Sequence, residues 1–143
     1  MISTRGRYAL RMMLDLAQHQ GEGVTALKDI AARQDISKKY LEQIIPLLSR
    51  AGLLQTTRGV HGGYRLTREP KDYTLGEILR ATETGLAAVA CMEENAPQCP
   101  RAGDCLTRPV WKELDRVVGT FLDGVTLEDV LDGNVPGGRR VDS

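Results

Sequence analysis

Apolar residues recur at helical spacing in the first fifty residues and predict three helices. The first follows Ser3 and Thr4 and ends near Gly21 and Gly23. A second, shorter helix is expected to be capped by Thr25, and a third begins at Ser37 and ends at Gly52. Their apolar faces hold Ala9, Met12, Met13, Leu16 and Ala17 in the first, Leu27, Ile30 and Ala31 in the second, and Leu41, Ile44, Ile45 and Leu48 in the third.

Pro46 lies within the third predicted helix. Proline removes a backbone donor and crowds the preceding turn, at a cost of about 3 kcal/mol in an ideal helix interior. We therefore expect the helix to be kinked or loosened there.

Two short runs around a glycine-rich loop follow the helices. Leu53–Thr57 and Tyr64–Thr67 read as strands, and Arg58–Gly63 between them contains three glycines. This arrangement predicts a β-hairpin.

The remaining chain predicts three more helices. Thr74, with Glu77 three residues later, has the spacing of a capping box and opens one of them. A longer amphipathic helix runs from Thr107 to about Asp123. A last short helix, with Leu127, Val130 and Leu131, is expected to be capped by Thr126 and Asp129.

Three helices followed by a hairpin is the order of elements in a winged helix-turn-helix domain. We predict a mainly α-helical protein, with a winged helix-turn-helix DNA-binding domain, a small β-hairpin wing and a long C-terminal dimerisation helix. The predicted divisions are a DNA-binding domain (1–84), a cysteine-containing loop (85–106), the dimerisation helix with a short terminal helix (107–132), and a disordered tail (133–143).

The formal net charge of the 143 residues is zero, but the charges are unevenly distributed. Residues 1–72 carry 12 Lys and Arg against 7 Asp and Glu, a net +5, and residues 73–143 carry 7 against 12, a net −5. A basic half can lie along phosphates while an acidic half faces away. The alternative is two ordinary solvated faces.

The first turns of the third helix carry polar, hydrogen-bonding side chains. Helix-turn-helix proteins read bases with these turns, because they enter the major groove. Gln43 can bind adenine and Glu42 can accept from cytosine, while lysines suit phosphates or guanine. The predicted DNA-contacting residues of this helix are Ser37, Lys38, Lys39, Tyr40, Glu42 and Gln43.

The glycine-rich loop adds a second predicted contact. Arg58 lies at its base, and its guanidinium can enter a narrow, electronegative minor groove. His61, Arg5 and Arg7 are predicted to contact phosphates. The alternative for all of these residues is an ordinary solvated surface.

Cys91, Cys99 and Cys105 are the only cysteines and lie within 15 residues of one another. An odd number cannot form a complete disulfide framework. Three thiolates suit an iron-sulfur cluster, zinc or copper(I), and a cluster normally takes four protein ligands. Independent thiols or a thiol-based redox switch are the alternatives.

Several separated motifs resemble the Rrf2 family of winged-helix regulators, over about residues 1–132. They are STRGRYA (3–9), ISKKYLEQ (36–43), RAGL (50–53) and RGVHGGY (58–64). CLTRPVW (105–111) and TLEDV (126–130) look most like the iron-sulfur cluster regulators of that family, and its cluster-free regulators of cysteine metabolism are more distantly similar.

The resemblance implies a homodimer that binds near-palindromic operators, with the long C-terminal helix crossing its mate. It implies recognition through Tyr40, Glu42 and Gln43, with Arg58 in the minor groove. It also implies a [2Fe-2S] cluster on Cys91, Cys99 and Cys105, supplied by iron-sulfur assembly proteins. Where the cluster regulators place a histidine, this chain has Arg108, so the fourth ligand is open: Glu93, Glu94, Asp104, a residue from the partner's first helix or an external thiol are the candidates.

Together these observations predict a cytoplasmic transcription regulator, a repressor, whose operator binding responds to the cluster. A cluster-free regulator that acts through a protein partner is one alternative, and an iron-sulfur carrier or electron-transfer protein is another. No phosphate loop or arrangement of nucleophile and base indicates an enzyme. No run approaches the roughly 18 apolar residues that a membrane span needs.

Overall fold

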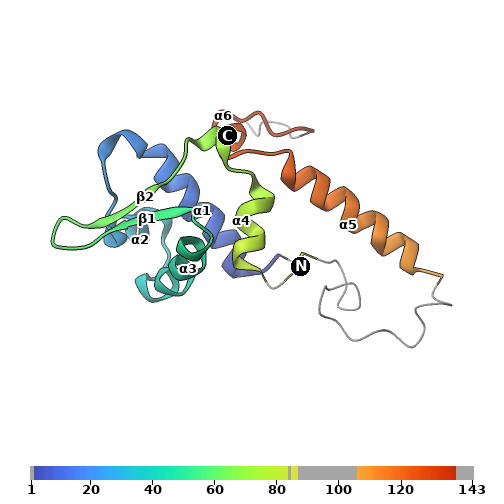
Figure 1. Cartoon of the computed structure of the whole chain (residues 1–143), viewed down its shortest axis with the longest axis horizontal. Coiled ribbons are helices and arrows are strands. Elements are labelled where there is room, and N and C mark those ends of the chain that lie inside the picture. Colours follow the sequence, from blue (N-terminus) through green and yellow to red (C-terminus); the bar gives the residue numbers. More distant parts are fainter. Residues whose placement is uncertain (1, 84, 87–105, 138–143) are drawn as a thin grey trace.

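The computed structural model describes residues 2–83, 85–86 and 106–137. Six α-helices, two short 3₁₀ helices and a two-stranded antiparallel hairpin occur in these ranges (Figure 1). In chain order they are α1 (Thr4–Gln18), η1 (Gln20–Glu22), α2 (Leu27–Gln34), α3 (Lys38–Arg50), β1 (Leu54–Thr57), β2 (Gly63–Leu66), η2 (Pro70–Asp72), α4 (Leu75–Thr82), α5 (Arg108–Asp123) and α6 (Leu127–Asp132). The predicted mainly α-helical winged fold is confirmed.

One hydrophobic core lies among α1, α2, α3, α4 and the hairpin. The apolar faces predicted for α1 and α3 are buried in it; Met12, Leu41 and Ile44 are fully inaccessible to solvent. Ser3 caps α1 by accepting a hydrogen bond from the Gly6 amide at 3.3 Å. Within the described ranges, none of the helices combines the length and the apolar character that crossing a bilayer requires.

Thr25 does not cap α2, contrary to the prediction. The N-cap is Ala26, whose side chain makes no capping bond. Thr25 is buried and forms a β-bridge with Tyr64, with two backbone hydrogen bonds of 2.9 Å between them. A residue from before α2 thus extends the hairpin by one bridge, and this long-range pairing outweighs the local capping preference.

α3 is continuous from Lys38 to Arg50, so the loosening expected at Pro46 does not interrupt it. Pro46 is exposed, and the buried residues Leu41, Ile44, Ile45 and Leu48 hold the turns on both sides of it against the core. Tertiary packing outweighs the missing backbone donor.

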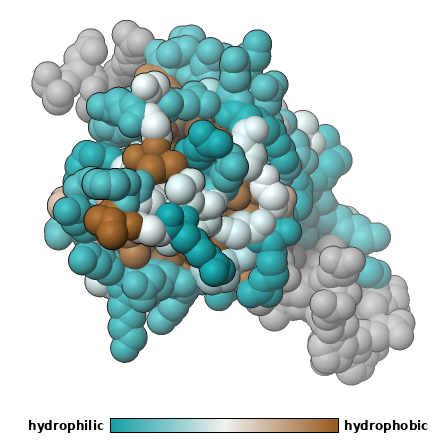
Figure 2. Space-filling view, turned by 60° about the vertical axis from the view of Figure 1, so that its left-hand side comes forward, coloured by the Kyte–Doolittle hydropathy of each residue, from teal (hydrophilic) through white to brown (hydrophobic). Residues whose placement is uncertain are grey.

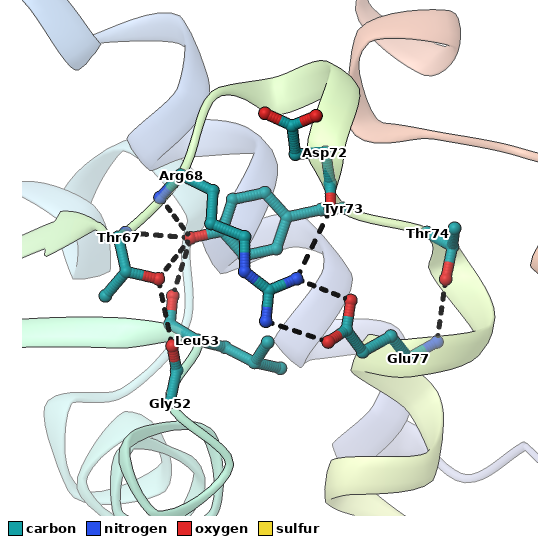
Figure 3. A network of polar contacts seen from close by, with 8 residues as sticks. All are labelled: Gly52, Leu53, Thr67, Arg68, Asp72, Tyr73, Thr74 and Glu77. Atoms are coloured by element: carbon teal, nitrogen blue, oxygen red, sulfur yellow. Dashed lines mark hydrogen bonds and ion pairs between the residues drawn. The ribbon is translucent and has the colours of Figure 1, made fainter.

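The base of the hairpin is fixed by a polar network around Tyr73 (Figure 3). The buried Tyr73 hydroxyl donates to the Leu53 carbonyl at 2.9 Å and accepts from the Thr67 amide at 2.8 Å. The Arg68 guanidinium lies 5.1 Å from the Tyr73 ring centroid and forms two hydrogen bonds with Glu77, of 2.8 and 2.9 Å. The network joins the start of β1, the end of β2 and α4.

Glu77 does not complete the predicted capping box. The Thr74 hydroxyl accepts from the Glu77 amide at 3.1 Å, but Arg68 binds the Glu77 carboxylate. The second predicted box is confirmed: Thr126 and Asp129 each accept a hydrogen bond from the other's amide at 3.0 Å.

α5 projects from the rest of the molecule, and the chain then returns to the core (Figure 1). α6 packs against α1, and its Leu127 is fully buried. Backbone bonds from Leu75 to Val125 (2.9 Å) and from Leu127 to Tyr73 (3.1 Å) fasten this return to the start of α4. The short terminal helix therefore belongs to the winged-helix core.

A buried carboxylate joins α1 to α2. Asp15 has 1% of its surface exposed and accepts hydrogen bonds from Arg33 at 2.7 and 3.0 Å and from Gln34 at 3.0 Å. Burial alone would raise the Asp15 pKa, but the bonds from Arg33 and Gln34 and the charge of Arg33 outweigh it, so the pKa lies below its usual value.

Asp15→Asn is expected to lower the free energy of unfolding by about 2 kcal/mol at neutral pH, because bonds to a charged acceptor are lost. The folded-state pKa is depressed, so this stabilisation is present above the unfolded pKa of about 3.9 and disappears as the pH falls through the folded value. Denaturant unfolding from pH 7 to pH 3 should show the two proteins converging. An unchanged difference across that range would contradict the assignment.

Candidate DNA-binding surface

The start of α3 presents a polar, charged edge. The Ser37 hydroxyl caps the helix by accepting from the Tyr40 amide at 3.1 Å. Lys38, Lys39, Glu42 and Gln43 are exposed, as is Ser37 itself. The helix therefore buries its apolar face and presents five of the six predicted DNA-contacting side chains to solvent.

Tyr40 differs from the other predicted contacts because it is half-buried. Its ring lies edge-to-face against Tyr8 of α1, with the ring centroids 5.3 Å apart. The sixth predicted residue of α3 is thus packed onto a neighbouring helix.

The hairpin loop is the second exposed element, and α3 packs directly against β1. Arg58 and His61 are exposed, and Val60 at the tip is 97% exposed. The side of the molecule on which the hairpin projects is mainly hydrophilic, with small hydrophobic patches (Figure 2). The predicted residues of α3 and of the hairpin loop therefore lie on two elements that pack against each other.

Glycines allow the loop to turn and to approach α2. Gly59 has a φ of 113°, in the region that L-residues with side chains rarely adopt. A Cβ on Gly63 would collide with the carbonyl group of Thr25, the residue that bridges to Tyr64.

Gly63→Ala is therefore expected to lower the free energy of unfolding by about 1–3 kcal/mol, since two backbone segments must separate. Gly21 is a matched control, because a Cβ there meets nothing within 4 Å and its φ is not positive. Gly21→Ala should leave stability unchanged or slightly raised in thermal unfolding. Equal effects of the two substitutions would contradict the close approach at Gly63.

Arg5 and Arg7 differ in how they are placed at the start of α1. Arg7 is exposed and donates to the Thr4 hydroxyl at 2.9 Å. Arg5 is half-buried, and its Nε atom is inaccessible to solvent without a hydrogen-bond partner among the described residues. The geometry thus favours Arg7 over Arg5 as a phosphate contact.

The electrostatics of the surface match a polyanion. Within the part of the chain that the structure describes, no ion pair engages Lys38, Lys39 or Arg58. Cations without an acidic partner remain available to phosphates.

A second exposed surface runs along α5. Val110, Leu114, Val117 and Phe121 are 57%, 40%, 49% and 44% exposed. Their spacing places them on one stripe of the helix, which the described part of the chain leaves uncovered.

The predicted metal ligands Cys91, Cys99 and Cys105 lie outside the described residues, as do Glu93, Glu94 and Asp104. Among the residues that are described, no group of three or more His, Cys, Asp or Glu side chains is placed to hold a metal ion. Arg108 is the first residue of α5 and is exposed.

Sequence reasoning missed Tyr8, Arg11 and the Asp15 network. The signal for Asp15 was available, because a carboxylate between Met12 and Leu16 on an apolar helix face requires a buried partner. Nothing in the local sequence pairs Tyr8 with Tyr40.

The arrangement defines the class: this is a winged helix-turn-helix DNA-binding protein. Comparison with known proteins narrows it. The model of the family described as "Rrf2: Iron-dependent Transcriptional regulator" matches residues 2–133. The chain belongs to the Rrf2 family of transcriptional regulators.

The chain is similar to relatives that carry three different names. It is 45% identical over 130 residues to "Protein rrf2" of Nitratidesulfovibrio vulgaris, covering 91% of this chain and 86% of that one. It is 40% identical to "HTH-type transcriptional regulator CymR" of Bacillus subtilis (90% and 88% covered) and 38% identical to "HTH-type transcriptional regulator IscR" of Aliivibrio salmonicida (93% and 78% covered).

Solved structures agree with this placement. The structure of CymR, the global cysteine regulator of B. subtilis, has a TM-score of 0.76 at 39% identity, covering 93% of this chain and 97% of that one. The structure of T. potens IscR has a TM-score of 0.75 at 37% identity, covering 99% and 93%. The protein is thus a DNA-binding transcription regulator, and its relatives are regulators and not enzymes.

Proposed function

We propose that the protein is a homodimeric repressor that binds operator DNA in the cytoplasm and whose affinity depends on a [2Fe-2S] cluster. Ser37, Lys38, Lys39, Tyr40, Glu42 and Gln43 of α3 read the major groove. Arg58 enters the minor groove, and His61, Arg7 and Arg5 contact phosphates. One observation carries the proposal: the exposed polar edge of α3 lies beside an exposed hairpin loop that contains glycines and carries Arg58.

The apolar stripe of α5 supports the homodimer. Four large apolar side chains at 40–57% exposure on one helix face favour burial against another surface. A second copy of α5 offers the same stripe, and a two-fold axis pairs the two without a further partner. Two recognition helices held in this way fit an operator with two half-sites.

The donor set supports an iron-sulfur cluster. Cys91, Cys99 and Cys105 supply three thiolates, which are soft ligands suited to iron. The family description includes iron dependence, and IscR is among the relatives. Arginine is a poor ligand, so Arg108 leaves the fourth position to another donor.

The cysteine segment follows α4 at one end and leads into the start of α5 at the other. Glu83, at the end of α4, accepts hydrogen bonds from the Ser3 amide (2.8 Å) and hydroxyl (2.9 Å) at the start of α1. Asp123, at the end of α5, accepts a 3.0 Å hydrogen bond from Arg80 of α4. When bound, the cluster supplies a fixed crosslink among the three thiolates. The bonds between Glu83 and Ser3 connect the start of the segment to α1, and the bond between Arg80 and Asp123 connects the far end of α5 back to α4. The cluster then changes the affinity for DNA to the extent that it binds the DNA-bound protein and the free protein with different affinities.

A cluster-free regulator like CymR is the second candidate. CymR is as similar to this chain as IscR is, in both sequence and structure. Under this alternative the cysteines are independent thiols, and a protein partner supplies the signal.

Anaerobic purification followed by absorption spectroscopy and by iron and sulfide analysis separates the two candidates. We expect a coloured dimer with about two iron and two sulfide ions per chain, as a [2Fe-2S] cluster requires. Replacing all three cysteines with alanine should abolish the colour and change operator affinity. A colourless, iron-free protein with unchanged affinity would favour the CymR-like alternative.

A further inference from the structure

Tyr40 is held by a neighbour outside its own helix. It lies in the first turn of α3, where its amide bonds to the Ser37 cap. Its ring packs edge-to-face on Tyr8 of α1, with 5.3 Å between centroids and 71° between ring planes. Such a contact restricts both rings to a narrow range of orientations.

Arg11 holds Tyr8 in turn. Its guanidinium carbon lies 5.3 Å from the Tyr8 ring centroid, in the geometry of a cation–π contact. The same guanidinium donates to the side-chain oxygen of Gln34 at 3.3 Å and to the Gln34 carbonyl. Gln34 is the last residue of α2, so Arg11 also satisfies a carbonyl at that helix end.

The turn between α2 and α3 begins beside this contact. Asp35 follows Gln34 with a φ of 52°, a left-handed conformation for a non-glycine residue. The Gln34 side chain also donates to the buried Asp15 at 3.0 Å. A continuous series of contacts therefore runs from the core carboxylate through Gln34, Arg11 and Tyr8 to Tyr40.

We propose that Tyr8 and Arg11 are positioning residues for DNA recognition, which hold the Tyr40 side chain in its DNA-binding orientation before DNA arrives. The inference rests on the proposed role of Tyr40 in contacting DNA. Its physical basis is preorganisation, because a side chain already ordered in the free protein loses less conformational freedom on binding. Neither residue needs to touch DNA itself.

A double-mutant cycle tests the role of Tyr8. The probe is the tightest duplex that the wild-type protein recovers from a random-sequence library, and the variants are Tyr8→Leu, Tyr40→Phe and the double variant. Tyr8→Leu is expected to weaken binding about 10-fold when Tyr40 is present, the scale of one side chain that must be ordered. In the Tyr40→Phe background the loss should be under about 2-fold, because residues that act through one another are not additive.

Tyr8→Phe is the conservative control, since it keeps the ring and removes only the hydroxyl. It should bind the probe like the wild-type protein. Equal losses from Tyr8→Leu in both backgrounds, or a loss from Tyr8→Phe as large as that from Tyr8→Leu, would overturn the inference, because either result indicates direct contact between Tyr8 and DNA.

The salt dependence of binding tests Arg11. Arg11→Met keeps an unbranched side chain and removes the charge, and we expect about 10-fold weaker binding with an unchanged slope of log affinity against log salt concentration. A slope reduced by about one unit per arginine would show a direct phosphate contact and overturn the positioning role.

Leu14→Ala controls for general destabilisation. Leu14 is on α1, half-buried and packed on the core, about 9 Å along the helix axis from Tyr8. With a comparable fall in thermal stability, it should bind the probe normally; an equal loss of affinity would reduce the Tyr8 effect to stability alone. Recovery of no preferred duplex by the wild-type protein would overturn the proposed function as well, whereas additive losses overturn only this inference.

Discussion

Leu114→Glu is expected to convert the protein from a dimer to a monomer and to weaken operator binding at least 100-fold. Leu114 lies in the middle of the exposed stripe of α5 that also contains Val110, Val117 and Phe121. In a two-fold interface the substitution places two carboxylates in an apolar contact, where burial of each unpaired charge costs several kcal/mol.

The loss of DNA affinity follows from the loss of the dimer. Two joined recognition helices bind the second half-site at a high effective concentration, which is worth about 10²–10⁴ in affinity. Sedimentation analysis measures the oligomeric state, and fluorescence anisotropy with a labelled operator measures the affinity.

Lys112→Glu is the matched control for this substitution. Lys112 is exposed and lies on the opposite side of α5 from Leu114. The substitution therefore adds a glutamate to the same helix, but away from the stripe. The Lys112 variant should remain dimeric. A Leu114→Glu protein that stays dimeric, or a Lys112→Glu protein that dissociates, would contradict the assignment of the interface.

Gln43→Ala is expected to weaken binding to the preferred operator about 10- to 100-fold and to relax the preference at one base pair of each half-site. Gln43 is exposed on the polar edge of α3, and a bidentate amide–adenine contact contributes about 1–3 kcal/mol of discrimination. Measuring affinity for duplexes with each of the four base pairs at that position identifies the base that Gln43 reads.

Lys38→Ala provides the contrasting result. A lysine that contacts only phosphate should weaken binding to all duplexes alike and lower the salt slope by about one unit per lysine. If Gln43→Ala weakened all sequences equally, or Lys38→Ala changed the base preference, the proposed division between the two residues would be wrong.

Local signals predicted most of the fold. The Thr126–Asp129 capping box and the Ser37 cap are contacts within three residues, so the sequence alone specifies them. The hairpin followed from a glycine-rich loop between two short runs, and β1 pairs with β2 in the expected antiparallel manner.

The errors arose where a distant residue competes for a local group. Thr25 pairs with Tyr64, 39 positions away, and Glu77 binds Arg68 instead of its own helix start. Tyr73 bonds to Leu53, just before β1, and to Thr67, just after β2. Such partners depend on how the elements pack, and helical or strand periodicity carries no information about them.

Local signals also predicted part of the candidate DNA-binding surface. The exposed edge of α3 and the hairpin loop followed from order and polarity along the chain. The burial of Tyr40 against Tyr8 and the partial burial of Arg5 did not, because both depend on the packing of α1.

Selection of duplexes from a random-sequence library at moderate salt is the most direct test of paired, sequence-specific DNA binding. We expect the purified protein to enrich an inverted repeat whose two half-sites lie about one helical turn, roughly 10 bp, or a multiple of it apart. Enrichment of no sequence, with the cysteines loaded with iron or free of it, would contradict the account.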